Sequence, residues 1–226
     1  MRRLTDVEKK ILRITDHTLL TVDASPDQIR AVCAEGLEFQ VASVCIPPAY
    51  VPDAAEFLAG RLPVCTVIGF PNGYTTTETK IFEAIQAQKS GATEIDAVIH
   101  IGMLKAGRDD RVRDEIFRLR EASRDSILKI IIETCKLSID EKIRMCAIVT
   151  EAGADFIKTS TGFSGAGATE DDVRLLKENV GPKVLVKAAG GIATIEDALQ
   201  MIEAGASRLG TSKMIRIISG LAETGY

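Results

Sequence analysis

The sequence predicts a (β/α)₈ barrel, or TIM barrel, formed by one α/β domain over residues 1–226 with an extra N-terminal helix. Two patterns lead to this prediction. Short runs of β-branched residues alternate with longer amphipathic segments, which is the βα order of a parallel barrel. Three helix-to-strand junctions also repeat one motif, a small residue followed by glycine and alanine. Barrels of this kind commonly reach about 200 residues without a second domain, so the chain length agrees with a single domain.

The expected elements begin with a helix near residues 6–13. Strands are expected at residues 14–19, 39–46, 64–69, 94–99, 127–133, 156–160, 184–188 and 207–210, because each is a short run rich in β-branched or other apolar side chains. Residues 78–89, 112–122, 140–151 and 195–203 show the apolar spacing of amphipathic helices. No low-complexity tract or linker interrupts this order.

The three repeated junctions stand at the same sequence distance from the residues of the strands that follow them. Their glycines are Gly91, Gly153 and Gly205, and five residues after each glycine come Asp96, Lys158 and Gly210, on the fourth, sixth and eighth expected strands. Alternate strands of a barrel fill one layer of its interior. Asp96 and Lys158 are therefore expected to point inward at the same level, with Gly210 leaving room beside them.

Composition and charge point to a small-molecule partner. The formal net charge is −4, and acidic and basic residues are interspersed without a polybasic run, which is not typical of proteins that bind nucleic acid or anionic membranes. The N-terminus lacks the apolar segment of a signal peptide, and no apolar run is long enough to span a bilayer. We therefore expect a cytoplasmic protein.

The cysteine and histidine content argues against a metal centre. Five cysteines are scattered without a CxxC pair, and the two histidines are His17 and His100. This pattern fits neither a zinc site nor a disulfide framework, and it is typical of a reducing compartment. We expect no metal and no cofactor, with both histidines in hydrogen-bonding or surface positions.

Two lysines interrupt apolar strands, Lys158 in ADFIKTSTGF and Lys187 in KVLVKAAGGI. Lysine is among the residues least often buried unless it is paired. Two ammonium groups close together in a pocket disfavour each other's charged form, so one pKa should fall and leave a neutral amine, which is a nucleophile toward carbonyl carbon. A single lysine of this kind more often extends from a strand end to water. Two such lysines, each followed by a glycine-bearing loop, favour chemistry.

Active sites of such barrels lie at the C-terminal ends of the strands, where the candidates are Asp16, Cys45, Asp96, Lys158 and Lys187. Asp16 and Asp96 could pair with lysine simply to keep the interior neutral, or they could take part in catalysis, and the sequence favours neither over the other. Cys45 is expected to be a small buried apolar residue rather than a nucleophile, because no histidine can be assigned to it.

Glycine-bearing loops follow the last three expected strands, at residues 160–162, 190–191 and 210–212. Each glycine alone is more often an ordinary turn residue. The loops after strands seven and eight, however, commonly form the phosphate site of this barrel. The sequence therefore predicts a phosphorylated substrate.

The segments DHTLL, SVCIPP, GFPNG, EIDAVIHIG, IIETC, ADFIKTSTGF, VKAAGGI and RLGTS give the chain a clear resemblance to the deoxyribose-phosphate aldolases, which are class I, Schiff-base enzymes. The resemblance extends from Asp16 to Tyr226. It implies that Lys158 forms the Schiff base, that Lys187 lowers the pKa of Lys158, and that Asp96 is the general acid and base. Asp16 would belong to the hydrogen-bonded network around Lys187. Tyr226 would transfer a proton at the enamine carbon.

The same resemblance implies a binding set for the substrate and its phosphate: Thr161, Gly162, Gly190, Gly191, Gly210, Ser212 and Cys45. His100 stands where asparagine is more frequent in the family, and Lys213 stands where a second serine commonly follows Ser212. Lys213 could add positive charge at the phosphate site, although a lysine facing solvent is the favoured interpretation.

The implied activity is the reversible, metal-free cleavage of 2-deoxy-D-ribose 5-phosphate to D-glyceraldehyde 3-phosphate and acetaldehyde. The expected partners are this sugar phosphate and the aldehyde, and the protein is expected to form a homo-oligomer, a dimer or a tetramer. Two alternatives stay open. One is another lysine-imine sugar-phosphate aldolase or a transaldolase, and the other is a non-catalytic barrel that binds sugar phosphates.

Overall fold

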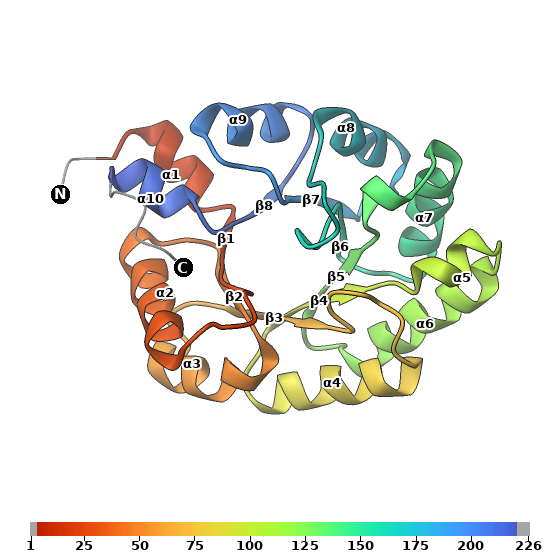
Figure 1. Ribbon diagram of the computed structural model, residues 1–226, viewed down its shortest axis with the longest axis horizontal. Helices are drawn as coiled ribbons and strands as arrows, with labels where there is room; N and C mark the ends of the chain where they lie inside the picture. Colours follow the sequence, from red (N-terminus) through yellow and green to blue (C-terminus); the bar gives the residue numbers. More distant parts are fainter. Residues whose placement is uncertain (1–3, 221–226) are drawn as a thin grey trace.

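A closed barrel of parallel strands forms the centre of the protein (Figure 1). The computed structural model describes residues 4–220, and eight strands occur in this part of the chain. They are β1 (Thr15–Thr18), β2 (Ser43–Ile46), β3 (Val64–Ile68), β4 (Glu94–Val98), β5 (Ile127–Ile131), β6 (Phe156–Lys158), β7 (Leu185–Ala189) and β8 (Arg208–Thr211). Each strand pairs with the next, and β1 pairs with β8 to close the ring. The (β/α)₈ prediction is confirmed.

The helices surround the barrel on its outside (Figure 1). They are α1 (Asp6–Leu12), α2 (Pro26–Phe39), α3 (Val51–Leu58), α4 (Thr77–Lys89), α5 (Ile101–Lys105), α6 (Asp109–Ala122), α7 (Ile139–Glu151), α8 (Glu170–Asn179), α9 (Ile195–Glu203) and α10 (Met214–Ser219), with 3₁₀ turns η1 (Pro48–Tyr50) and η2 (Thr134–Lys136). The additional N-terminal helix α1 contacts α9 and α10. Within residues 4–220, no helix is both long enough and apolar enough to cross a lipid bilayer.

Helix ends explain the one large error in the predicted strand boundaries. Residues 39–42 are not part of the second strand, because α2 continues to Phe39. Gln40 caps the helix in a left-handed conformation, with a φ of 52°. Phe39 packs against the hydrophobic core from the last turn of this helix. The apolar residues that the sequence assigned to the start of the second strand therefore include the last residue of α2, and β2 begins only at Ser43. The other strand ends differ from the prediction by a few residues.

Side chains alternate along each strand between the helices and the barrel interior. Apolar residues such as Ile95, Ile130 and Ile157 belong to the main core, which lies between the strands and the helices. The residues on either side of them in sequence, including Asp96, Lys129 and Lys158, point inward and contact one another. The barrel interior is therefore largely polar, which is unusual because such interiors are mostly filled by branched apolar side chains.

Candidate active site

A cluster of charged side chains fills the middle of the barrel. Among the described residues it contains four cations and three carboxylates, contributed by β1, β4, β5, β6, β7 and β8: Lys129, Lys158, Lys187, Arg208, Asp16, Glu94 and Asp96. The three lysines are almost completely buried. Charges are costly to bury unless they are paired, so the contacts within the cluster determine which groups stay ionised.

Asp96 lies at the centre of this cluster. Its Oδ2 accepts hydrogen bonds from Nζ of Lys158 at 2.7 Å and from Nζ of Lys187 at 2.6 Å, while its Oδ1 accepts from Nζ of Lys129 at 2.9 Å. Burial alone would raise the pKa of Asp96, but the three lysines outweigh burial and hold this pKa well below its ordinary value of 3.8. Asp96 is therefore a carboxylate at neutral pH and can accept a proton.

Asp16 stabilises Lys187 from the opposite side. The Lys187 ammonium group contacts Oδ2 of Asp16, while NH1 of Arg208 and the hydroxyl of Ser43 reach Oδ1 at 3.1 and 2.7 Å. Burial favours the neutral form of Asp16, but Lys187 and the other nearby cations outweigh it and lower its pKa to about 2. In the same way, burial would lower the pKa of Lys187, but the Asp16 and Asp96 carboxylates raise it above its ordinary value. Lys187 therefore remains an ammonium ion.

The three lysines differ in the number of carboxylates that hold their protons. Among the described side chains, Lys129 contacts three carboxylates, Lys187 contacts two, and Lys158 contacts only Asp96. With four cations and three carboxylates, the loss of one proton would balance the charge of the cluster. Lys158 has the fewest carboxylate partners of the three lysines, and it alone of them lines a cleft.

The cleft lies at the C-terminal ends of the strands and has a volume of about 290 Å³. It is lined by Lys158 and by every member of the predicted binding set except Cys45: Thr161, Gly162, Gly190, Gly191, Gly210 and Ser212. Lys213 is exposed to solvent, as expected, and it also lines this cleft. A larger cavity of about 480 Å³ lies on the outside of the barrel, beside α2 and α3, but it includes no residue of the charged cluster.

The structure explains why three positions at the cleft are occupied by glycine. Gly190 and Gly191 both have a φ of 80°, a left-handed conformation that side chains rarely adopt. At Gly210, an added Cβ would lie 2.9 Å from Cβ of Ala189 and 3.2 Å from Cε of Lys187. Gly210 therefore leaves the space that the Lys187 side chain occupies, whereas the sequence predicted that it leaves room beside Asp96 and Lys158.

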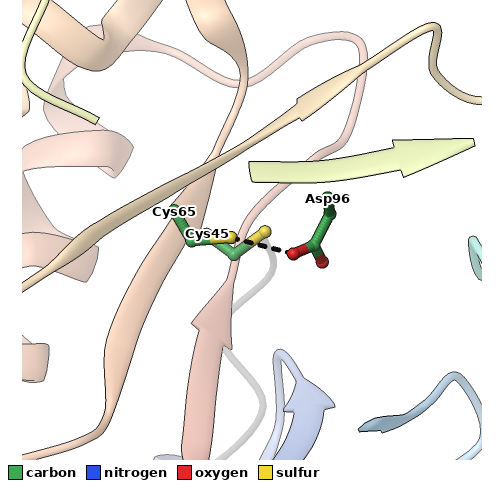
Figure 2. A group of neighbouring side chains, drawn as sticks. All are labelled: Cys45, Cys65 and Asp96. Atoms are coloured by element: carbon green, nitrogen blue, oxygen red, sulfur yellow. Dashed lines mark hydrogen bonds between the residues drawn. The ribbon is translucent and has the colours of Figure 1, made fainter. Parts of the chain in front are cut away.

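Cys45 lies inside the barrel but does not line the cleft. It is completely buried and clusters with Cys65 and Val67, and the partly buried side chains of Leu20 and Phe70 pack against this cluster. Figure 2 shows its thiol beside Cys65 and Asp96. The assignment of Cys45 to the substrate-binding set therefore does not match its position in the free protein. A hydrogen bond with Cys65, outweighing burial, lowers the pKa of the Cys45 thiol.

The same three side chains are close enough to be considered as metal ligands, since one donor atom from each of Cys45, Cys65 and Asp96 lies within 4.8 Å of the others. The surrounding charge opposes a cation, however. Nζ of Lys129 lies 3.3 Å from Sγ of Cys65 and 2.9 Å from Oδ1 of Asp96. A divalent ion at this position would face that ammonium group directly, so the residues present do not fit a metal centre.

Several predicted residues lie outside the cluster. His17 is buried against α2, where Nε2 lies 2.7 Å from Oε2 of Glu35, and His100 accepts a hydrogen bond from Met103 N at the start of α5. Both histidines thus have the expected hydrogen-bonding positions. Tyr226 lies outside the described residues.

Sequence reasoning did not identify three members of the cluster, Glu94, Lys129 and Arg208. The available signal was the one that identified Lys158, a charged residue inside an apolar strand such as EIDAV or ILKII. Lys129 binds its proton strongly, because Asp96, Cys65, Asp16 and Glu94 outweigh burial and raise its pKa well above the ordinary value. It therefore acts as a fixed positive charge beside Asp96, its register partner on the neighbouring strand.

Taken together, the fold and the cluster define a (β/α)₈ barrel that holds buried lysines paired with carboxylates next to a cleft at the C-terminal ends of its strands. The chain belongs to the DeoC/LacD family of aldolases, whose model matches residues 10–222.

The chain is 50% identical over 218 residues to a deoxyribose-phosphate aldolase of Clostridioides difficile, covering 96% of this chain and 100% of the relative. It is 51% identical over 210 residues to a deoxyribose-phosphate aldolase of Streptococcus agalactiae, covering 93% of this chain and 94% of the relative. Among solved structures, the tetrameric deoxyribose phosphate aldolase of Aeropyrum pernix superposes with a TM-score of 0.89 at 27% identity, over 94% of this chain and 91% of that chain.

Proposed function

We propose that the protein catalyses the reversible aldol cleavage of 2-deoxy-D-ribose 5-phosphate to D-glyceraldehyde 3-phosphate and acetaldehyde through an imine on Lys158. The observation that carries this proposal is the hydrogen bond of 2.7 Å between Lys158 and Asp96 at the edge of a cleft lined by glycine-rich loops. The relatives named as deoxyribose-phosphate aldolases, which cover more than nine-tenths of the chain, support the same substrate.

The reaction begins when Lys158 gives its proton to water in the cleft and its neutral amine attacks C1 of the open-chain sugar. Loss of water gives a protonated imine. A base then removes the proton from the C3 hydroxyl, the bond between C2 and C3 breaks, and its electron pair moves into an enamine on Lys158 while glyceraldehyde 3-phosphate leaves. Protonation of C2 and hydrolysis of the imine release acetaldehyde. Asp96 is suited to the proton transfers because it is ionised and lies within hydrogen-bonding distance of Lys158.

The remaining predicted residues have supporting roles in this proposal. Lys187 stays protonated and, with Asp16, holds Asp96 in place. The phosphate lies against Thr161, Gly162, Gly190, Gly191, Gly210 and Ser212, and Lys213 adds a positive charge at the same end of the cleft. Tyr226 would protonate the enamine carbon from the C-terminal segment.

Borohydride trapping tests the nucleophile. Incubation with 2-deoxyribose 5-phosphate and sodium borohydride, followed by peptide mass mapping, is expected to place the reduced adduct on Lys158. An adduct on Lys187 would reverse the assignment of the two lysines. The Lys158→Leu variant is the control that should not be labelled. Comparing acetaldehyde with dihydroxyacetone phosphate as the donor in the synthetic direction separates this activity from that of other lysine-imine aldolases and transaldolases.

We also infer that residues 1–226 act as one domain in a cytoplasmic homo-oligomer that is a dimer or a tetramer. All five cysteines lie in the described part of the chain and are free thiols, which is typical of a reducing compartment. The related aldolase of Aeropyrum pernix is tetrameric. Light scattering on the purified protein measures the number of subunits, and a monomer at micromolar concentration would contradict this inference.

A further inference from the structure

Glu133 is a buried carboxylate that the proposed chemistry does not use. It lies two residues after the end of β5, at the end of the barrel where the cleft lies, and its side chain is completely buried. Oε1 accepts a hydrogen bond from the backbone N–H of Thr161 at 3.2 Å, and Oε2 accepts one from the Ser164 hydroxyl at 2.9 Å. Oε2 also accepts a short hydrogen bond from the Thr161 hydroxyl. These donors are all neutral, and all belong to the loop that follows β6.

The backbone at Glu133 is as unusual as its environment. Its φ of 56° and ψ of 67° place it in the left-handed region. Gln40 and Ala59, the other non-glycine residues with positive φ in residues 4–220, end helices, where this conformation is common. Glu133 instead lies in the connection between β5 and η2, in contact with Thr161, which lines the cleft. A strained backbone and a buried charge are both costly, and such features persist where the surrounding structure fixes them, often at functional sites.

The loop that Glu133 holds is residues 159–168, which we call the β6 loop. Its far end is fixed by β7, because the backbone N–H of Ala168 donates to the carbonyl groups of Ala189 and Gly190 at 3.0 Å. Gly167 packs so closely there that an added Cβ would lie 2.2 Å from the Gly190 carbonyl oxygen. Glu133 fixes the near end of the same loop, so the β6 loop is held at both ends.

Between these two attachments lie the β6-loop residues that form the wall of the cleft. Thr161, Gly162 and Phe163 all line it. The hydroxyl of Thr161, which donates to Glu133, also accepts a hydrogen bond from the backbone N–H of Phe163 at 3.1 Å. The Phe163 ring packs edge-on against Phe70 with 5.4 Å between ring centres. The position of the Glu133 carboxylate therefore sets where the backbone of Gly162 and Phe163 lies in the cleft.

We propose that Glu133 is a positioning residue: it holds the β6 loop in the shape that receives the phosphate group, and it thereby gives the protein its preference for phosphorylated over unphosphorylated sugars. This inference rests on the proposed function and adds the structural origin of phosphate selectivity. Glu133 touches no reacting atom in this account. It acts through Thr161, whose amide and hydroxyl it orients.

The test compares two substrates, 2-deoxyribose 5-phosphate and unphosphorylated 2-deoxyribose, in the wild type and in Glu133→Gln. Glutamine has the same shape but one acceptor oxygen instead of two and an N–H₂ group that faces the β6-loop donors. For the phosphorylated sugar, KM is expected to rise at least about tenfold with a smaller change in kcat, a loss comparable to that of one buried charge-assisted hydrogen bond. For the unphosphorylated sugar, kcat/KM should change by less than about threefold.

Two further variants separate positioning from a general loss of stability. Glu115→Gln removes another buried carboxylate, which accepts from Nζ of Lys80 at 2.8 Å and does not line the cleft. It should lower thermal stability and leave the ratio of the two kcat/KM values unchanged. Ser164→Ala removes one of the donors to Glu133 and should shift the ratio in the same direction as Glu133→Gln, by a smaller factor. This milder variant keeps the inference testable if Glu133→Gln does not fold.

Calorimetric titration with inorganic phosphate gives a readout that does not depend on aldol cleavage. Phosphate should bind the wild type at least about tenfold more tightly than Glu133→Gln. Equal phosphate affinity in the two proteins, no phosphate binding by the wild type, or an equal loss of kcat/KM for both sugars would overturn the inference. A wild type that binds phosphate but does not cleave 2-deoxyribose 5-phosphate would instead refute the proposed function, while the titration would still test Glu133.

Discussion

Lys158 and Lys187 are register partners on neighbouring strands β6 and β7, and their ammonium nitrogens contact the same oxygen of Asp96, at 2.7 and 2.6 Å. Two cations are thus held together by one shared anion. Lys187 has a second carboxylate partner, Asp16, whereas Lys158 has none besides Asp96 among the described residues. This difference supports the proposal that Lys187 keeps a permanent charge and that Lys158 is the nucleophile.

Replacing Lys187 by leucine should move the activity optimum to higher pH and leave little activity at neutrality. Without the Lys187 charge, Asp96 and Asp16 are less well compensated, so the proton on Lys158 is held more tightly and the neutral amine forms only at higher pH. The pH dependence of kcat/KM measures this shift. Lys80→Leu removes a buried lysine on α4 that pairs with Glu115, and it should affect stability without moving the profile. A Lys187→Leu profile of unchanged shape and position would show that the lysines are not coupled.

Asp16 should contribute to the acid sensitivity of the fold. Its pKa falls from 3.8 to about 2 because Lys187, Lys129 and Arg208 outweigh the effect of burial. The folded state therefore releases this proton at a lower pH than the unfolded state, so the contribution is complete above about pH 4 and is lost as the pH falls towards 2. The shift corresponds to about 2 kcal/mol. Urea unfolding between pH 2 and 5 should show a shallower slope of unfolding free energy against pH in Asp16→Asn, and equal slopes would contradict this assignment.

Cys45→Ala should retain aldol cleavage and survive longer than the wild type in concentrated acetaldehyde. The lowered pKa of the Cys45 thiol increases its thiolate fraction, which is the form that attacks unsaturated aldehydes produced by acetaldehyde condensation. The thiol is buried, so reagents reach it only if the partly buried side chains of Leu20 and Phe70, which pack against its cluster, move. Residual activity after timed incubation measures the difference. Cys146→Ala, another buried thiol whose pKa burial raises to about 12, is the control that should give no protection. Equal inactivation of wild type and Cys45→Ala would show that the aldehyde does not reach this thiol.

Deletion of Tyr226, or its replacement by phenylalanine, should slow turnover and the exchange of acetaldehyde methyl protons with solvent deuterium. Proton transfer by a positioned side chain contributes about 10² to 10⁴ in rate, so a loss within this range is expected. The free energy of unfolding and the borohydride trap on Lys158 should be unaffected, because Tyr226 is proposed to act only at the enamine carbon. An exchange rate equal to that of the full-length chain would remove the tyrosine from the mechanism.

Local sequence patterns were sufficient for the barrel, the order of its strands and the pairing of Asp96 with Lys158. The reason is that strand and helix periodicities are local, and the repeated glycine junctions at Gly91 and Gly153 place both residues at the same distance along their strands. The loops at the C-terminal ends of the strands could be grouped in the same way, because parallel strands bring these ends to one side of a barrel. Thr161, Gly162, Gly190 and Ser212 accordingly line one cleft.

The tertiary structure alone decided which charges neutralise one another. Closing the ring pairs β1 with β8, which brings Asp16 to Arg208 across 192 residues, and the pairing of β4 with β5 places Lys129 beside Asp96. It also buries Cys45 beside Cys65 and joins Glu133 to the β6 loop. These contacts depend on the register between strands that are distant in sequence and on the inward or outward direction of each side chain. A single sequence encodes that register only through the packing of the whole barrel, so the charge balance of the cluster emerges only in the folded chain.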